Sequence, residues 1–453
     1  MCALRDNAGM MPARSIRSSL QSLLRGLLPR VAATLACATL LPALGQSATS
    51  PAPDAAKPTS SAASKPARKA TASGGPKTAQ GATQKARTQG ERHGRGKGGQ
   101  EAATKADRKA ARAATTSGTA YAGREDVMQW AAELAQRQGM DPAWTRRVLA
   151  QARLQPAVQR LIQPPATGTR KNWAAYRARF IDERRISAGL RFWDAQRADL
   201  ARAEREYGVP AEVIAGIIGV ETLYGQHMGQ FRVIDALATL AFDHPSEHPR
   251  LTERVGFFRG ELEQFLTLAH RSGGDPLLPL GSFAGAMGLP QFMPSSWIRW
   301  GVDFDGDGHI DLRRSPSDAI GSVANYFKVH GWQPGLPTHF PVAFDSARVD
   351  MDALLAPDIL PTFSVAKFQA LGAVIEGPAL AHAGPLALVE LQNGEAPNSY
   401  VAGTENFYAI TRYNQSSYYA MAVIELSQAL REARGQQARQ AGGASQPAPA
   451  PSR

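Results

Sequence analysis

Apolar residues recur at every third or fourth position through much of the chain after residue 124, which is the spacing of amphipathic helices. The pattern predicts helices over residues 126–137, 142–151, 173–207, 253–270 and 418–430. Between residues 386 and 401 it changes to the alternation of strands, on either side of the turn-forming Asn393-Gly394. The fold is therefore predicted to be α+β, mainly α, with a small antiparallel sheet in the region of residues 341–405.

Glu221 continues the apolar stripe of a further predicted helix, which opens at Val209-Pro210. Ile214, Ile217 and Ile218 define this stripe, and Glu221 is the next residue on the same face. An unpaired carboxylate is costly on a buried face, so Glu221 must be paired, protonated or open to a cleft. A general acid and a structural hydrogen-bond network both satisfy that condition.

Four aspartates within residues 303–311, DFDGDGHID, have the spacing of a calcium-binding loop. In an EF-hand-like loop over residues 303–314, the predicted ligands are Asp303, Asp305, Asp307, the backbone carbonyl of His309, and Asp311. Arg314 takes the last position, where an EF-hand normally supplies a bidentate Glu. We therefore expect weaker binding or direct ligation by Asp311. A turn of solvated carboxylates is the alternative, although so many unneutralised aspartates would repel one another.

Several segments resemble the B-type lytic murein transglycosylases. Residues 219–225 read GVETLYG, and residues 281–297 read GSFAGAMGLPQFMPSSW. Further matches include GEL at residues 260–262 and NFYAITRYNQSSYY at residues 406–419. The resemblance runs in order from residue 124 to residue 430 and implies a lysozyme-like helical catalytic core with an EF-hand-like calcium loop.

The resemblance implies a reaction carried by one carboxylic acid. Glu221 would protonate the oxygen of the β-1,4 bond between N-acetylmuramic acid and N-acetylglucosamine in peptidoglycan, with the muramyl N-acetyl group as internal nucleophile. It would then deprotonate the C6 hydroxyl, which closes onto C1 and leaves a 1,6-anhydromuramyl end. By matched position, the residues that contact substrate would be Ser282, Gln291, Tyr413, Asn414 and Tyr419. Calcium would be structural, with Asp311 as a direct ligand, and no organic cofactor is implied.

Two other functions are compatible with the residues. A hydrolytic muramidase or chitinase-like glycosidase would be better served by a second carboxylate opposite Glu221. Asp235 and Asp243 are the candidates, although each could instead cap a helix. A non-catalytic wall-binding scaffold could use the same groove without an ionisable Glu221. The sequence contains no HExxH or GxSxG motif that would favour a metallopeptidase or a serine hydrolase.

The chain outside the predicted catalytic domain, residues 123–430, has a different composition. Basic residues, an apolar run and the small residues at 43–45 predict a signal peptide over residues 1–45, and hence export to the periplasm. An uncleaved membrane anchor is the alternative for this apolar run. Residues 46–122, rich in Ala, Lys, Pro and Gly, are predicted to be a disordered linker, and residues 431–453 a disordered tail.

The net charge of +12 resides in these tails, because residues 121–430 contain more acidic than basic side chains. The high isoelectric point therefore does not indicate nucleic-acid binding. A basic tether on an exported enzyme would attract anionic lipid or wall polymer, and a merely soluble spacer is equally compatible. Peptidoglycan glycan strands are the expected partner. Cys2 and Cys37 both precede residue 46, so a mature chain starting there would have no thiol chemistry.

Overall fold

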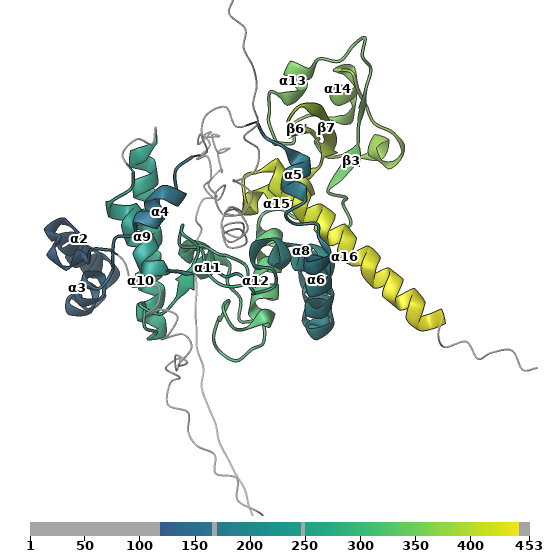
Figure 1. Ribbon diagram of the computed structural model, residues 1–453. Coiled ribbons are helices and arrows are strands. Elements are labelled where there is room, and N and C mark those ends of the chain that lie inside the picture. The colour runs from purple at the N-terminus through teal and green to yellow at the C-terminus, as the bar shows by residue number, and fades with distance from the viewer. Residues whose placement is uncertain (1–117, 165–169, 246–249, 444–453) are drawn as a thin grey trace, which may run out of the picture. The chain divides into compact units, whose positions relative to one another are not determined.

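The computed structural model describes residues 118–164, 170–245 and 250–443 (Figure 1). The predicted signal peptide and the linker as far as residue 117 lie outside these ranges. Ordered structure begins before the expected boundary at residue 123, because Tyr121 is buried in a short 3-10 helix, η2 (Tyr121–Gly123), and packs against Phe242. Within the described ranges, no helix is long and apolar enough to cross a membrane.

The first part of the described chain is helical, as predicted. Its helices are α2 (Glu125–Gln138), α3 (Pro142–Ala150), α4 (Pro156–Leu161), α5 (Trp173–Arg177), α6 (Glu183–Ala195) and α7 (Arg197–Tyr207). The prediction of one continuous helix over residues 173–207 was wrong, because α5, α6 and α7 occupy this range. The carboxylate of Asp182 caps a new helix by accepting a 2.8 Å hydrogen bond from the backbone N–H of Arg185, and a second break falls at Gln196.

Helix α8 (Ala211–Thr222) is buried on almost every side. Glu212 and Glu221 are its only residues that are not buried, since α6, α7, α12 and α16 pack around it (Figure 1). The elements that follow are β1 (Phe231–Arg232), α9 (Val233–Phe242), α10 (Leu251–Ser272), β2 (Leu280–Gly281), α11 (Pro294–Trp300) and α12 (Pro316–Val329). Strands β1 and β2 pair antiparallel and join the start of α9 to the segment that contains Ser282.

The β region, residues 339–403, contains the predicted small antiparallel sheet and has its own hydrophobic core. Its strands are β3 (His339–Pro341), β4 (Ala343–Phe344), β5 (Ala373–Val374), β6 (Ala387–Asn393) and β7 (Ala396–Gly403), with α13 (Met351–Leu355), α14 (Val365–Ala370) and η3 (Gly377–Ala381) between them. Strands β3, β7 and β6 form one antiparallel sheet in that order, and β4 pairs with β5. Gly394, at a φ of 68°, forms the predicted hairpin turn.

Two helices complete the described part of the chain, α15 (Glu405–Tyr413) and α16 (Ser417–Gly443). The chain is helical to Gly443, and not disordered from residue 431 as predicted. Two ion pairs tie this extension to the other helices: Arg431 lies 3.6 Å from Glu212 of α8, and Arg434 lies 3.0 Å from Asp194 of α6. These tertiary contacts stabilise helical turns whose own sequence has no apolar stripe.

Candidate active site

Glu221 lies in the last turn of α8, where it is partly buried. Its Oε1 accepts a 2.5 Å hydrogen bond from the hydroxyl of Tyr419, in the first turn of α16. Burial raises the pKa of Glu221 to about 7, although the hydrogen bond from Tyr419 acts in the opposite direction. The carboxyl group can therefore hold a proton near neutral pH and release it to a substrate.

The backbone turns sharply after Glu221. Leu223 and Tyr224 both adopt left-handed conformations, with φ of 50° and 57°, which are uncommon for residues other than glycine. The hydroxyl of Thr222 donates to the carbonyl of Leu289 at 2.9 Å and accepts from the backbone N–H of Gly225 at 3.0 Å. The end of α8 is thus fastened to the segment that precedes α11.

Tyr413 and Tyr419 lie beside one another. Their rings stack with centroids 6.3 Å apart and planes 13° apart. The hydroxyl of Tyr413 donates to the carbonyl of Pro290 at 2.5 Å. Burial, followed by the charge of Glu221, raises the pKa of both tyrosines well above the ordinary value. Both hydroxyls therefore remain protonated and act as hydrogen-bond donors.

Gln291, Tyr413 and Asn414 line one pocket of about 250 Å³, so three of the predicted substrate residues come together there. Gln291 has a left-handed backbone, with a φ of 49°, and its side-chain amide donates to the carbonyls of Gly288, at 2.9 Å, and Met228, at 3.3 Å. The remaining lining residues are Phe257, Glu261, Phe292, Met293, Ser295, Ser296, Arg299, Trp300, Tyr326, His330, Arg412 and Gln415. Aromatic rings beside charged and amide groups suit a sugar ring with its hydroxyls.

Tyr419 and Glu221 do not line this pocket, but they are connected to it, because Tyr419 stacks on Tyr413 and bonds to Glu221. Ser282 does not line it either, and it is buried. Its hydroxyl oxygen accepts from the backbone N–H groups of Ala284, at 3.3 Å, and Ala286, at 3.0 Å. Ser282 therefore shapes the turn after β2, and its hydroxyl proton remains available to donate.

Glu261 lines the pocket and was not predicted as a site residue. Its carboxylate accepts from the backbone N–H of Ser295 at 2.9 Å and from the Ser295 hydroxyl at 2.6 Å, which joins α10 to α11. Burial raises its pKa. The sequence contained the same signal as for Glu221, because Glu261 lies on the apolar stripe of Phe258, Leu262 and Phe265.

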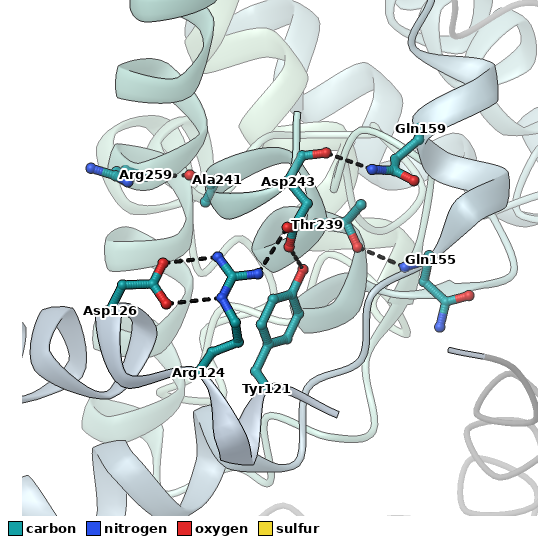
Figure 2. Close-up of polar contacts among 9 residues, drawn as sticks. All are labelled: Tyr121, Arg124, Asp126, Gln155, Gln159, Thr239, Ala241, Asp243 and Arg259. Atoms are coloured by element: carbon teal, nitrogen blue, oxygen red, sulfur yellow. Dashed lines mark hydrogen bonds and ion pairs between the residues drawn. The ribbon is translucent and has the colours of Figure 1, made fainter. Parts of the chain in front are cut away.

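The two carboxylates considered as partners of Glu221 in a hydrolase have other contacts. Asp235 is fully buried and pairs with Arg232 at 2.6 Å. Figure 2 shows that Asp243 accepts from the Tyr121 hydroxyl at 2.6 Å and pairs with Arg124 at 2.9 Å. Both carboxylates therefore hold neighbouring segments against α9. Neither is placed to act as the second carboxylate that a hydrolase would need opposite Glu221.

Three predicted metal ligands converge in the acidic loop. Carboxylate oxygens of Asp303, Asp305 and Asp307 lie within 4.8 Å of one another, and His309 is exposed with its backbone N–H bonded to Asp307. Oxygen donors at this spacing fit a hard divalent cation such as calcium. Asp311 does not belong to this group of three.

The carboxylate of Asp311 instead accepts from the backbone N–H groups of Arg313 and Arg314 and lies 3.8 Å from the Arg314 guanidinium. The loop is closed by Asp318 of α12, which the loop spacing did not predict. Its carboxylate accepts from the backbone N–H groups of Phe304 at 2.8 Å and Asp311 at 2.7 Å. Asp318 thereby holds both ends of the loop.

A helical core with a protonatable carboxyl at the end of a buried helix is the arrangement of lysozyme-like enzymes that cleave glycan chains. Residues 123–428 match the family model described as transglycosylase SLT domain. The chain belongs to this family of lytic murein transglycosylases, lyases that act on peptidoglycan.

Individual relatives match most of the described chain. Over 335 residues it is 40% identical to the membrane-bound lytic murein transglycosylase B of Escherichia coli K12, which covers 70% of this chain and 86% of the relative. The crystal structure of the soluble lytic transglycosylase SltB1 from Pseudomonas aeruginosa matches with a TM-score of 0.62 and 41% identity, over 68% of this chain and 99% of that chain. Escherichia coli lytic transglycosylase Slt35 in complex with calcium matches with a TM-score of 0.60 and 40% identity, over 70% and 96%.

Proposed function

We propose that Glu221 is the single acid and base of a lytic transglycosylase that leaves 1,6-anhydromuramyl ends. The observation that carries this proposal is a carboxyl of pKa about 7 that is bonded to the hydroxyl of Tyr419. The protonated carboxyl donates to the glycosidic oxygen as the bond to C1 of N-acetylmuramic acid breaks. The carboxylate that results removes the proton of the C6 hydroxyl, whose oxygen bonds to C1. No water is consumed, and Glu221 ends the cycle protonated.

The neighbouring side chains orient the substrate. Tyr419 directs the carboxyl through its hydrogen bond, and Tyr413 packs beside it. Gln291 and Asn414 line the wall of the pocket, where their side chains face the sugar hydroxyls and N-acetyl groups. The hydroxyl of Ser282 is held by its turn, and it assists the N-acetyl group only if substrate approaches from that side.

The chain acts on glycan strands after export to the periplasm. The composition of residues 1–45 and 46–117 supports this location and a basic tether to anionic lipid or wall polymer. Family membership supports the glycan substrate.

The products of purified murein test this reaction. A transglycosylase releases muropeptides with anhydromuramyl ends, each lighter by one water than the hydrolysed end and resistant to borohydride reduction. We expect such products from the first turnover, as measured by mass spectrometry of a digest. Reducing muramyl ends in their place would assign the enzyme as a hydrolase.

Tyr419→Phe should shift the pH dependence of cleavage. Its hydroxyl lowers the pKa of Glu221, so its removal should raise that pKa further. The acid must be protonated to act, and the alkaline limb of the pH–rate profile should therefore move to higher pH while the maximal rate falls. Tyr413→Phe is the matched control, because the Tyr413 hydroxyl bonds to Pro290 and not to Glu221. If the alkaline limb of the pH–rate profile did not move in Tyr419→Phe, a group other than Glu221 would determine it.

The acidic loop is proposed to hold calcium through Asp303, Asp305 and Asp307, as a structural ion. A ligand that binds only the native state stabilises it by about 2.7 kcal/mol at a hundredfold excess over Kd. Chelation should lower the melting temperature by several degrees, and the double change Asp305→Ala with Asp307→Ala should mimic it. Asp352→Ala, at an exposed position of α13, is the control. Activity measured well below the transition should largely survive; immediate loss of turnover at constant melting temperature would assign the ion to catalysis.

A further inference from the structure

The β region forms part of a second cavity, of about 190 Å³, which shares no lining residue with the pocket of Gln291 and Tyr413. Its walls come from strand β6, the end of α13 with the chain that follows it, the first turn of α16, and Lys171, which precedes α5. The lining residues are Lys171, Leu355, Asp358, Ile359, Leu388, Val389, Glu390, Gln392, Ser417 and Tyr418. The proposed catalytic chemistry uses none of them.

A carboxylate is held in a fixed position on one wall. Glu390 accepts from the side-chain amide of Gln392 at 2.9 Å, the amide of Asn398 at 2.8 Å and the hydroxyl of Tyr400 at 3.0 Å. Burial acts to raise the pKa of Glu390, but the hydrogen bonds from Gln392, Tyr400 and Asn398 lower it on balance. The group remains ionised at neutral pH: its hydrogen-bond donors are neutral, and the nearby charge of Lys171 also favours the ionised form.

A cation and an aromatic ring form another part of the lining. The Lys171 ammonium lies 5.8 Å from the ring centroid of Tyr418, and its positive charge helps to lower the pKa of Glu390. Its backbone carbonyl is fixed by the N–H of Gly394 at 3.0 Å. The Tyr418 hydroxyl accepts from the backbone N–H of Gln392 at 2.7 Å and donates to the Gln392 carbonyl at 3.1 Å. The ring is therefore locked in place.

The rim contains a strained residue. Asp358 adopts a φ of 55°, a left-handed conformation that costs an ordinary residue on the order of 1 kcal/mol. Its exposed carboxylate adds a second negative charge to the lining that contains Glu390. Such strain persists where the surrounding chain enforces it, and it is frequent at binding sites.

We propose that this cavity binds the zwitterionic part of a short peptide. A ligand carboxylate would pair with Lys171, a ligand ammonium would pair with Glu390 and Asp358, and the aliphatic carbons between them would rest on Leu388 and Val389. A neutral sugar does not need this separation of charge, and a polyanion would be repelled by the two carboxylates. The stem peptides of peptidoglycan carry both ammonium and carboxylate groups on short aliphatic chains. The proposal that they are the ligand rests on the proposed function.

Direct binding of the free stem pentapeptide, without sugar, tests the site by isothermal titration calorimetry on the full chain. We expect one site, equal affinity in wild type and in Glu221→Gln, and no competition from peptide-free glycan. Lys171→Met should weaken binding about tenfold, the loss of one charge-assisted hydrogen bond. Lys367→Met, an exposed lysine of α14 outside the cavity, should leave it unchanged. A peptide acetylated at its amines and amidated at its carboxylates should bind more weakly.

Two results would overturn the site. The first is equal peptide affinity in Lys171→Met and wild type. The second is displacement of the peptide by peptide-free glycan, which would place the peptide in the catalytic pocket. Ile359→Trp fills the cavity from its rim and should abolish binding without touching the charges. Murein cleavage is scored separately, so a failure of the proposed catalytic role would appear as activity in Glu221→Gln and not as a change in peptide affinity.

Discussion

Replacing Glu221 with glutamine should abolish the cleavage of peptidoglycan and leave the fold intact. Glutamine keeps the shape of the side chain and can still accept the hydrogen bond from Tyr419, but it has no transferable proton. A positioned general acid contributes on the order of 10² to 10⁴-fold to a rate. In the proposed cycle one residue acts twice, so the loss should lie at or above the upper end. Anhydromuropeptide release from purified murein is the measurement.

The same variant should be more stable than the wild type at alkaline pH. The native state raises the pKa of Glu221 from 4.5 to about 7, so the native protein binds this proton more tightly than the unfolded chain does. The contribution of Glu221 to stability is therefore present below pH 4.5 and is lost as the pH rises through 7. Glutamine stays neutral, and urea unfolding should show Glu221→Gln above the wild type at pH 8 and level with it near pH 4.

Glu212→Gln is the matched control for both measurements, because Glu212 is the other carboxylate of α8 and pairs with Arg431 on the helix exterior. It should retain cleavage and show no stabilisation at pH 8. Wild-type turnover in Glu221→Gln would remove this residue from the mechanism.

Gly219→Ala should destabilise the protein by about 1–3 kcal/mol, the range for an overpacked core. A Cβ at Gly219 would lie 2.4 Å from the Tyr224 hydroxyl and 2.9 Å from Leu426 of α16. The methyl group must displace the Tyr224 ring and the Leu426 side chain between α8 and α16, and the hydrogen bond between Tyr419 and Glu221 spans the same two helices. Thermal unfolding should shift down by several degrees, and cleavage should fall at temperatures where the chain is still folded.

Removal of the obstructing hydroxyl provides a rescue. Within the described residues the Tyr224 hydroxyl has no hydrogen-bond partner, so Tyr224→Phe alone should be nearly neutral. Combined with Gly219→Ala it should restore part of the lost stability, a coupling that a double-mutant cycle measures. Gly260→Ala, at an exposed position of α10 with nothing within 4 Å of its Cβ, should instead stabilise by roughly 0.5–1 kcal/mol. Simple additivity of the first two changes would exclude the contact.

The sequence predicted correctly those features that depend on residues close together in the chain. The hairpin of β6 and β7 follows from alternation around Asn393-Gly394, and Glu221 stood out because a charge on an apolar stripe is costly wherever the helix packs. The break before α6 was missed although Asp182 is an ordinary N-cap residue, because the apolar spacing continues through it. The apolar spacing favours a continuous helix and the N-cap residue favours a break, and only tertiary contacts decide between them.

The pocket could not be assembled from spacing alone. Trp300, Tyr326 and Arg412 belong to α11, α12 and the end of α15, and only the packing of these helices brings them to one wall. Asp318 was overlooked because it follows the acidic loop and reaches back to its amides. The resemblance to a family pointed to Gln291, Tyr413 and Asn414, which line the same pocket. Hydrophobic periodicity contains no information on such contacts between distant segments.

The hydrogen bond between Glu221 and Tyr419 joins residues 198 positions apart in the chain. Tyr419 belongs to α16, which a ribosome makes after every other element that the structure describes. A chain cut short before α16 would carry the acid without its partner and without the helix that buries it. Cleavage by the proposed mechanism is therefore expected only from a chain that has been made at least as far as the first turn of α16.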